Sequence, residues 1–305
     1  MIAHWDEVEW VRRAKGEMDA EWQRLGDAAG TVEVGVNRVR IAPGKLSTPP
    51  HSHGASEEIV YVLAGAGLVW QDEAVYEVAA GDCVVFRANE LEHTLRGGDD
   101  GLEVLVFGTR HPVEFGWLPR SSAVRLGWPW VAGRTDNPWE IEAQSDPLEF
   151  AQPGERPANV VAVADVAARR TRGTGDGSVK PLADAAGSAK TGLNHVRLGP
   201  GAAGSRLHCH GAEEEVFVVL DGDGTILLER APLARGDADE SGEHAVRAGD
   251  VIVRPAGTRV AHQLRAGEAG LTYVAYGTRD PNDVVYYADS GEVFLRGVGV
   301  TIKAN

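Results

Sequence analysis

The chain contains one long pattern twice, and this internal repeat limits what it can fold into. Residues 27–67 align without a gap with residues 184–224, and 20 of the 41 aligned pairs are identical. Further along, residues 93–110 align with residues 262–279. Each copy exceeds 80 residues, whereas the units of solenoid proteins run to about 20–50 residues. We therefore expect two domains of the same fold that arose by duplication.

Both copies have the sequence pattern of β-strands. The first contains VNRVRI, IVYVLAG, CVVF and LEVLVFG, which are rich in Val and are separated by Gly, Asn, Asp and Pro. Many short strands of this kind are typical of antiparallel sandwiches and barrels. From Asp6 to Leu25 the apolar residues fall three or four positions apart, which predicts a helix. The fold class expected from the residues is mainly β with a short N-terminal helix.

Composition and charge exclude several classes of partner. The net charge is −15 and no basic stripe is present, so a nucleic acid is not expected to bind. No run of 18 apolar residues is found, and the first residues are charged, so neither a membrane span nor a signal peptide is expected. Cys83 and Cys209 lie inside the repeats and are expected to be free thiols. A cytoplasmic protein with a small-molecule ligand or substrate fits these features.

Two histidines separated by one residue recur in the best-matched stretch of each copy, HSHGASEE and HCHGAEEE. Residues two apart on a strand point to the same face, so His51 and His53 can bind one cation together. Glu58 is the expected carboxylate partner and Glu57 is its rival. The small Gly and Ala between the histidines and the glutamates can break the strand and change which residue points inward.

A third histidine follows in each copy, after a Gly-Asp turn and a strand that can fold back beside the first pair. Six of the ten histidines fall in this pattern, which favours ligands over histidines that merely cap turns or pack inside a barrel. Three imidazoles and one carboxylate suit Mn, Fe, Co, Ni, Cu or Zn, with up to two ions per chain. The expected ligands are His51, His53, Glu58, His93, His208, His210, Glu215 and His262.

The order of glycines and ligands resembles the signature of the cupin superfamily. That signature is G-x5-H-x-H-x3,4-E-x6-G followed by G-x5-P-x-G-x2-H-x3-N. The resemblance covers residues 27–111 and 184–280, with departures. One extra residue precedes the first histidine of each copy. In the first copy, Arg87 and Asn89 stand where the signature has Pro and Gly. Both copies lack the final Asn of the signature.

The resemblance implies a bicupin, with two antiparallel jelly-roll barrels that each enclose a metal. We expect an N-terminal barrel with its leading helix in residues 1–111, a Trp- and Pro-rich segment in 112–157, and a C-terminal barrel in 158–305. The Trp-rich stretch 117–139 could be a lid, although a sheet cover or a dimer contact is favoured. The sequence leaves open whether two chains associate as a homodimer.

Bicupins with intact ligand sets resemble dioxygenases and decarboxylases. The resemblance therefore implies a metal-dependent enzyme of one of these types that acts on a small organic molecule. The alternative is a protein that binds or senses a small ligand without turnover. The sequence does not name the metal or the substrate, and it does not say whether both centres work.

Two further pairs of residues recur in both copies and allow two interpretations each. Arg110 and Arg279 end matching apolar strands, where either could hold a substrate carboxylate, but a salt bridge at the barrel rim is favoured. Glu57 and Glu214 precede the expected carboxylate ligands. They could act as an acid or a base, but a solvent-facing carboxylate is favoured.

Overall fold

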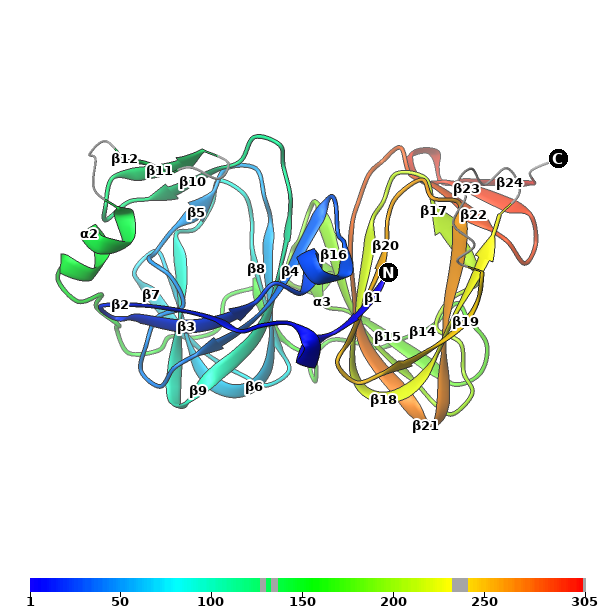
Figure 1. Cartoon of the computed structure of the whole chain (residues 1–305), viewed down its shortest axis with the longest axis horizontal. Coiled ribbons are helices and arrows are strands. Elements are labelled where there is room, and N and C mark those ends of the chain that lie inside the picture. The colour runs from blue at the N-terminus through cyan, green and yellow to red at the C-terminus, as the bar shows by residue number, and fades with distance from the viewer. Residues whose placement is uncertain (127–129, 133–136, 232–240, 304–305) are drawn as a thin grey trace.

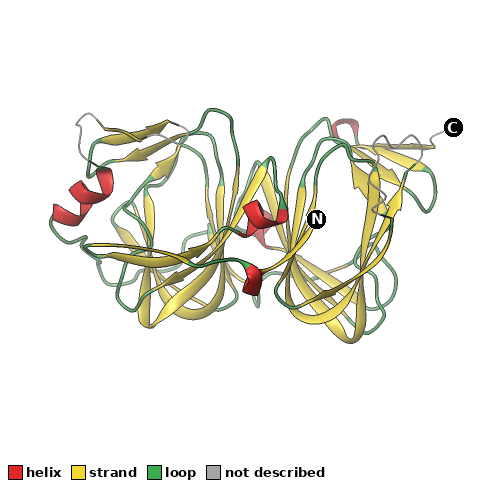
Figure 2. Ribbon diagram, in the orientation of Figure 1, coloured by secondary structure: helices red, strands yellow, loops and turns green. Residues whose placement is uncertain are grey.

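The computed structural model describes residues 1–126, 130–132, 137–231 and 241–303. Two barrels lie side by side, and the helices are few and short (Figure 1; Figure 2). The long strands pair in antiparallel fashion. The prediction of a mainly β fold made of two antiparallel barrels is confirmed. Among the described residues, no helix is long and apolar enough to cross a membrane.

The first barrel is an eight-stranded sheet, and a four-stranded sheet lies at one end of it (Figure 1). The eight strands follow the order β13-β8-β6-β9-β4-β3-β2, with β7 beside β6. Their bounds are β2 (Val11–Lys15), β3 (Met18–Gln23), β4 (Val34–Ile41), β6 (Glu58–Gln71), β7 (Ala74–Ala79), β8 (Asp82–Phe86), β9 (His93–Thr109) and β13 (Val160–Ala162). The smaller sheet contains β5 (Ser52–His53), β10 (Phe115–Leu118), β11 (Ala123–Leu126) and β12 (Trp130–Ala132).

The second barrel belongs to a twelve-stranded sheet. Its strands are β1 (Ile2–His4), β14 (Arg169–Arg170), β15 (Gly177–Pro181), β16 (Thr191–Leu198), β17 (His208–His210), β18 (Glu215–Arg230), β19 (Gly242–Arg247), β20 (Asp250–Arg254), β21 (Val260–Thr278), β22 (Val284–Tyr287), β23 (Glu292–Leu295) and β24 (Val300–Lys303). The helical turns are η1 (Trp5–Glu7), α1 (Leu25–Ala29), α2 (Pro138–Gln144), α3 (Leu182–Ala185) and η2 (Arg296–Val298). The insertion of the second copy connects β18 to β19, and its residues 232–240 lie outside the described part.

Strands at the contact between the barrels, such as β8 and the first half of β6, are buried on both faces, because one face meets the barrel interior and the other meets the second barrel. On β6, Val60 and Val62 belong to the core inside the first barrel, whereas Ile59 belongs to a core that both barrels share. Successive side chains on a strand point to opposite faces, so one strand can serve two cores. Phe107 and Tyr276 meet in the shared core, with ring centroids 5.0 Å apart.

The helix predicted over residues 6–25 is wrong, because β2 and β3 form a hairpin there and only α1 follows as a short helix. Gly16 lies in the turn with φ of 58°, which suits a tight hairpin turn, and Lys15 pairs with Met18. Met18 and Ala20 are buried on one face of β3. The apolar spacing therefore also fits a strand, and pairing of β3 with β4 decides the outcome.

Each barrel contains one strand from the opposite half of the chain. β1 pairs with β20 of the second barrel, and β13 pairs with β8 of the first barrel. The two exchanges are equivalent in register, because Ile2 lies opposite Ile252 and Val160 lies opposite Val84. The domain limits given above stay a prediction, and the pairings add that the barrels exchange their outermost strands.

Two buried glutamates tie the barrels together in a reciprocal way. The carboxylate of Glu57 accepts backbone N–H bonds from residues 189–191 at 2.8–3.0 Å. The carboxylate of Glu214 accepts the equivalent bonds from residues 32–34 at 2.7–3.1 Å. Their exposures are 1% and 0%, so the favoured interpretation of solvent-facing carboxylates is wrong. Their neighbours on the strand point into the barrels, so these two must point toward the other barrel.

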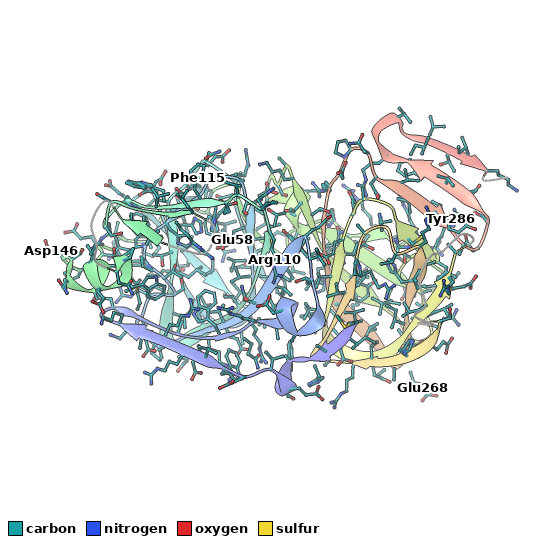
Figure 3. All side chains as sticks on the ribbon, turned by 45° about the horizontal axis from the view of Figure 1, so that its top comes forward. Glu58, Arg110, Phe115, Asp146, Glu268 and Tyr286 are labelled. Atoms are coloured by element: carbon teal, nitrogen blue, oxygen red, sulfur yellow. The ribbon has the colours of Figure 1, made fainter. Side chains whose placement is uncertain are left out.

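The recurring arginines also act at this interface. Arg110 forms an ion pair with Asp27, and Arg279 forms one with Asp184. Figure 3 shows Arg110 toward the region between the barrels. These contacts support the salt-bridge interpretation. Both cysteines are buried free thiols.

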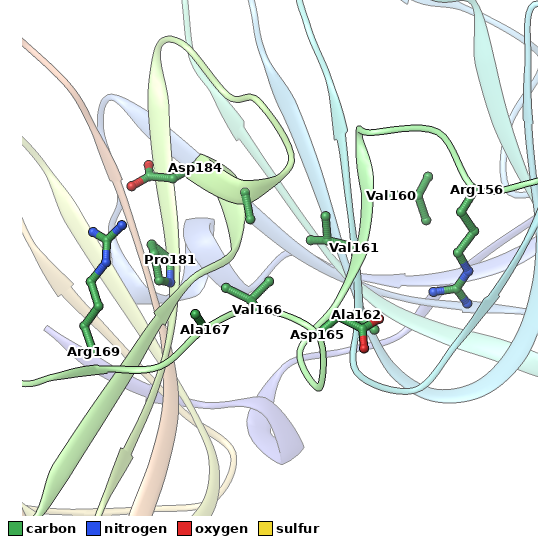
Figure 4. A pocket seen from close by; sticks show the side chains of 11 residues that line it. Arg156, Val160, Val161, Ala162, Asp165, Val166, Ala167, Arg169, Pro181 and Asp184 are labelled. Atoms are coloured by element: carbon green, nitrogen blue, oxygen red, sulfur yellow. The ribbon is translucent and has the colours of Figure 1, made fainter.

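A hollow of about 550 Å³ lies where the chain passes from one barrel to the other (Figure 4). Its floor is apolar and includes Val160, Val161 and Val166, and charged groups stand at its edges. Two of these are already paired within the protein, because Arg156 binds Asp82 and Asp184 binds Arg279. None of the residues expected to bind metal lines this hollow.

Candidate metal centres

Three segments bring the ligands of the first centre together inside the first barrel. β5 ends at His53, the chain then leaves the strand, and β6 begins at Glu58. His51 forms an isolated bridge with His93, the first residue of β9, through backbone bonds of 2.9 and 3.2 Å. The break between β5 and β6 turns Glu58 inward and its rival Glu57 outward. Figure 3 shows Glu58 inside this barrel.

One ligand atom from each of these four residues lies within 4.8 Å of the others. The carboxylate of Glu58 lies between two imidazoles, with Oε2 3.4 Å from Nε2 of His53 and Oε1 3.3 Å from Nε2 of His93. The side chains of His53 and Glu58 are each 19% exposed. The structure therefore brings together the four residues that the sequence predicts, and the side chains of His53 and Glu58 are partly exposed, whereas that of His93 is buried.

The second centre repeats this arrangement with a difference in His210. His208, Glu215 and His262 offer ligand atoms that lie within 4.8 Å of one another. Oε2 of Glu215 is 2.8 Å from Nε2 of His262, 3.8 Å from Nε2 of His208 and 3.4 Å from Nε2 of His210. His210 instead belongs to a second group with Glu213 and Asp283, although its Nε2 still faces Glu215. Three of the four predicted residues thus converge closely, and His210 lies beside them.

Hydrogen bonds to the outer ring nitrogens fix how the histidines face. Nδ1 of His51 donates to the carbonyl of Pro49 at 3.0 Å, and Nδ1 of His208 donates to that of Arg206 at 2.7 Å. Nδ1 of His93 likewise donates to a backbone carbonyl at 3.1 Å. With the proton held on Nδ1, the lone pair of Nε2 faces the centre, where a cation would bind.

The largest difference lies behind the second histidine of each pair. Nδ1 of His210 donates to Oδ2 of Asp283 at 2.7 Å. Glu114 holds the matching position in the first centre, but its oxygens accept the N–H groups of residues 54–56 and the hydroxyl of Ser56. Asp283 also accepts the N–H groups of residues 211 and 212, so both carboxylates hold the loop after the histidine pair, and the one in the second centre orients a ligand as well.

The wall of the two centres also differs. Phe86 lies opposite Glu58 in the strand pairing and stacks on His93, with ring centroids 3.7 Å apart and planes 5° apart. Arg254 lies opposite Glu215 in the second centre and is 4% exposed. The first centre is therefore bounded by an aromatic ring where the second is bounded by a guanidinium.

The protonation of the ligands suits a cation in the first centre. Burial, together with the charges of His93 and His53, lowers the pKa of His51 to about 3. The pKa of Glu58 lies well below its usual value, because hydrogen bonds from His53 and His93 outweigh the opposing effect of burial. A neutral imidazole and an ionised carboxylate are the forms that bind metal.

The charges around His210 are more strongly coupled. Burial lowers the pKa of His210, but Glu215 and Asp283 raise it to about 9. Glu213 lies nearby, where burial raises its pKa to about 7 against the charge of Arg296, with which it forms an ion pair. The second centre thus contains a chain of ionisable groups that the first does not have, because Ser56 stands in the place of Glu213.

The unpaired atoms of the centres test whether an ion fits. Nε2 of His53, His210 and His262 and Oε2 of Glu215 are buried without a hydrogen-bond partner among the described residues. Buried polar atoms are rarely left without a partner. Because these atoms face one another as nitrogen and carboxylate donors, a transition-metal ion would satisfy them together.

Sequence reasoning missed Glu114 and Asp283, although the repeat contains a signal for them. The alignment of 93–110 with 262–279 continues for a few residues without a gap, and there the two acidic residues occupy the same position. An acidic residue kept in both copies beyond the last matched strand marks a contact to the loop after the histidine pair. The lid interpretation of residues 117–139 stays untested, because residues 127–129 and 133–136 lie outside the described part.

Comparisons with known proteins agree with this geometry. Residues 37–108 match the family described as Cupin domain. The structure resembles oxalate decarboxylase from Bacillus subtilis, at 16% identity and a TM-score of 0.61, over 95% of this chain and 78% of that one. The chain has the bicupin fold. A comparison of the sequence with curated proteins finds no match.

Two further structures resemble this bicupin chain to the same degree. One is the formate complex of Lactobacillus farciminis oxalate decarboxylase, at 14% identity and a TM-score of 0.61, over 94% of this chain and 88% of that one. The other is a Bacillus subtilis oxalate decarboxylase with Mn(II) centres, at 15% identity and a TM-score of 0.60, over 93% of this chain and 78% of that one. At these identities the likeness establishes the fold and not the activity.

Proposed function

We propose that this bicupin is a metal-dependent enzyme that acts on a small organic molecule, with chemistry of the dioxygenase or decarboxylase type. The observation that supports the proposal is the first centre, where three imidazoles and one carboxylate converge and two of the four side chains are partly exposed. A structural metal site is closed by its protein ligands, whereas a catalytic site keeps positions for a substrate. The ligand set leaves such positions on an octahedral ion.

The protein's own residues would hold the ion and shape the space beside it. His51, His53, Glu58 and His93 are the proposed ligands of the first centre, and the Nδ1 bonds of His51 and His93 keep those two imidazoles in position. A bound ion would polarise a coordinated oxygen of the substrate as a Lewis acid. The ring of Phe86 covers one side of His93, which excludes water from that side and strengthens electrostatic interactions within the centre.

The proposal extends to the second centre, with up to two divalent transition-metal ions per chain. Manganese is the first ion that we would test, because the Bacillus subtilis relative has Mn(II) centres. Iron, cobalt, nickel, copper and zinc also suit nitrogen and carboxylate ligands. The two centres need not prefer the same ion, because their surroundings differ at Asp283 and at Phe86.

The test begins with elemental analysis of the protein after expression and after reconstitution with each ion. Oxygen consumption and carbon dioxide release are then measured with a panel of carboxylic acids, phenols and diketones. Turnover that depends on the ion and disappears in His53→Ala or His210→Ala supports an enzyme. Tight metal binding without turnover on any compound favours the alternative, a protein that binds or senses a small ligand. Less than a few tenths of an ion per chain after reconstitution contradicts both.

A further inference from the structure

The outer face of each barrel has a row of directly paired residues across four strands, and the two rows differ in charge. In the first barrel the row runs from Arg12 on β2 through Glu21 on β3 and Arg40 on β4 to Glu103 on β9. Residues directly opposite each other on antiparallel strands place their side chains on the same face. Guanidiniums and carboxylates therefore alternate along the first row.

The arginines of the first row already have carboxylate partners. Nε of Arg40 donates to Oε2 of Glu103 at 3.0 Å. Arg12 donates two hydrogen bonds, of 2.7 and 2.8 Å, to the carboxylate of Asp19. An anion from solvent would have to displace one of these carboxylates, so the first row is not expected to bind one.

The equivalent row of the second barrel keeps both arginines and has neither glutamate. It runs from Arg170 on β14 through Ser178 on β15 and Arg197 on β16 to Thr272 on β21. The strands correspond one to one with those of the first row, and the residues pair in the same order. Two hydroxyl groups therefore stand where the first row has two carboxylates.

The second row faces solvent. Val196 and Leu198 flank Arg197 on β16 and belong to the core inside the second barrel, and successive side chains on a strand point to opposite faces. Thr272 lies in the same way between two core residues of β21. Both arginines of the row are exposed, and Ser178 between them is partly buried. A ligand from solvent can therefore reach this row.

Neither arginine of the second row forms an ion pair or a side-chain hydrogen bond with another described residue. Two carboxylates lie near the row, because Asp221 pairs with Thr272 at its end and Asp176 directly precedes β15. In the described part of the chain, neither forms an ion pair with these arginines. Acidic residues outnumber basic ones, with a net charge of −15, so the composition does not explain two arginines without a carboxylate.

A hollow of about 540 Å³ lies beside the row. Arg170 and Ser178 line it, together with Arg169 and Asp176. Sites for small ligands typically measure about 300–1,000 Å³. Arg169 also stands at the edge of the hollow between the barrels (Figure 4), but none of the residues expected to bind metal lines either one. The row and its hollow therefore lie apart from both metal centres.

We propose that the second barrel binds the phosphate group of a small molecule on its outer face, where Arg170 and Arg197 hold the phosphate from two sides and the hydroxyl of Ser178 donates between them. Neighbouring strands lie about 4.8 Å apart, so the two arginine backbones are about 10 Å apart and their long side chains can meet over Ser178. A tetrahedral phosphate offers oxygens to both guanidiniums, whereas the two oxygens of a carboxylate match one. The negative charge of the whole protein repels a nucleic acid or an anionic membrane, which favours a small ligand.

The experiment titrates the Mn(II)-loaded protein with inorganic phosphate and, separately, with glycerol phosphate and with acetate. Calorimetry measures binding, and the Mn(II) electron paramagnetic resonance spectrum, which should not change, reports whether an anion enters a metal centre. Arg170→Gln and Arg197→Gln should each raise the Kd of the phosphate probes about 10-fold, because a charge-assisted hydrogen bond is lost. Acetate should bind more weakly than either phosphate probe.

A further variant restores the charge pattern of the first row. Ser178→Glu supplies the carboxylate that Glu21 has in the first barrel, where the same pairing with Arg40 forms, so the fold should tolerate it. This variant should abolish phosphate binding. Ser178→Ala should weaken binding less than the loss of either arginine, because it removes one neutral hydrogen bond and no charge.

The first row supplies matched controls. Arg12→Gln and Arg40→Gln change the arginines at the same two places of a row that already has its carboxylates, so each should leave the Kd unchanged. Equal losses in these controls would show that only the total charge of the protein matters, which overturns the site.

The other outcomes are equally decisive. The phosphate site is overturned if no phosphate probe binds saturably, or if Arg170→Gln, Arg197→Gln and Ser178→Glu leave the Kd unchanged. It is also overturned if acetate binds more tightly, or if the Mn(II) spectrum changes in step with the heat of binding. If the protein takes up no metal, the proposed function fails, and the same titrations of the metal-free protein still test the second row. Tighter binding of glycerol phosphate than of inorganic phosphate would support a phosphate ester as the ligand.

Discussion

The two metal centres contain the same ligands in the same order, but different groups hold and surround them. In the first, Glu114 holds the loop after the histidine pair, and Phe86 stacks on His93. In the second, Asp283 holds the equivalent loop and also orients His210 through a hydrogen bond, and Arg254 lies opposite Glu215 where the first has Phe86 opposite Glu58. Duplication kept what binds an ion and changed what tunes it, so we expect the two centres to differ in affinity and in reactivity.

The largest test of this comparison removes one ligand from each centre. His53→Ala and His210→Ala should each reduce the metal content by about one ion per chain, because the loss of one ligand of four opens the coordination shell. One of the two variants should lose most of any turnover. Elemental analysis and activity assays on both variants check this. If each variant kept half of the wild-type activity, the centres would be equivalent.

The next test concerns the carboxylates behind the histidines. Asp283→Asn should weaken metal binding at the second centre by about 10- to 100-fold, because His210 loses the group that fixes its ring. Glu114→Gln should have a smaller effect on the first centre, since its oxygens hold backbone N–H groups and not His53. Competition with a chelator measures both affinities. Equal losses in the two variants would show that the carboxylates act only on the loops.

A smaller and symmetric effect is expected at the barrel interface. Glu57→Gln and Glu214→Gln should each lower the free energy of unfolding by about 1–3 kcal/mol, because the amide presents N–H groups to backbone donors. Chemical denaturation of both variants measures this. Unequal losses of unfolding free energy would show that the contacts of Glu57 and Glu214 with the opposite barrel differ in strength, although the metal ligands of the two copies are the same.

The buried carboxylate of Glu57 also predicts how the stability of the protein depends on pH. Burial raises the pKa of Glu57, but hydrogen bonds from Ala189, Ser188 and Thr191 lower it below its usual value. In the folded protein the carboxylate of Glu57 therefore stays ionised at a lower pH than in the unfolded chain, where its pKa is about 4.3. The stabilisation is complete above that value and is lost as the pH falls through the folded pKa. Glu57→Gln should flatten this part of the stability profile.

The smallest effect is expected for the rim ion pairs. Arg110→Gln and Arg279→Gln each remove an ion pair whose partners are 30–47% exposed. Solvent screens such pairs, so each change should cost less than about 1 kcal/mol, and neither should alter metal content. A thermal unfolding curve for each variant is sufficient. A loss of turnover in either variant would show that the arginine acts at a metal centre and not only in a rim ion pair.

The ligands could be predicted from the sequence because the repeat supplies each observation twice. The same logic would have revealed Glu114 and Asp283 had the alignment been continued past Arg110 and Arg279. The N-terminal hairpin could not be predicted from local spacing, because the apolar residues of this segment fit both a helix and a strand. The pairing of β3 with β4, which is not visible in the local sequence, decides for the strand. The inward direction of the Glu58 side chain was predicted from the strand break. The burial of Glu57 could not be predicted, because it depends on how the second barrel packs against the first, and the sequence of one copy does not contain that information.

The exchange of β1 and β13 has a consequence for the order in which the chain is made. Strand β1 is made before the first barrel but belongs to the second, and the amine of Met1 donates to the carbonyl of Val253, 252 positions along the chain. The first barrel, in turn, lacks β13 until synthesis has passed its own ligands. The first barrel cannot close before residues 160–162 have been made, whereas β1 is already present when the second barrel is made. Contacts so distant in sequence form slowly, so the first barrel is completed only after synthesis of the second has begun.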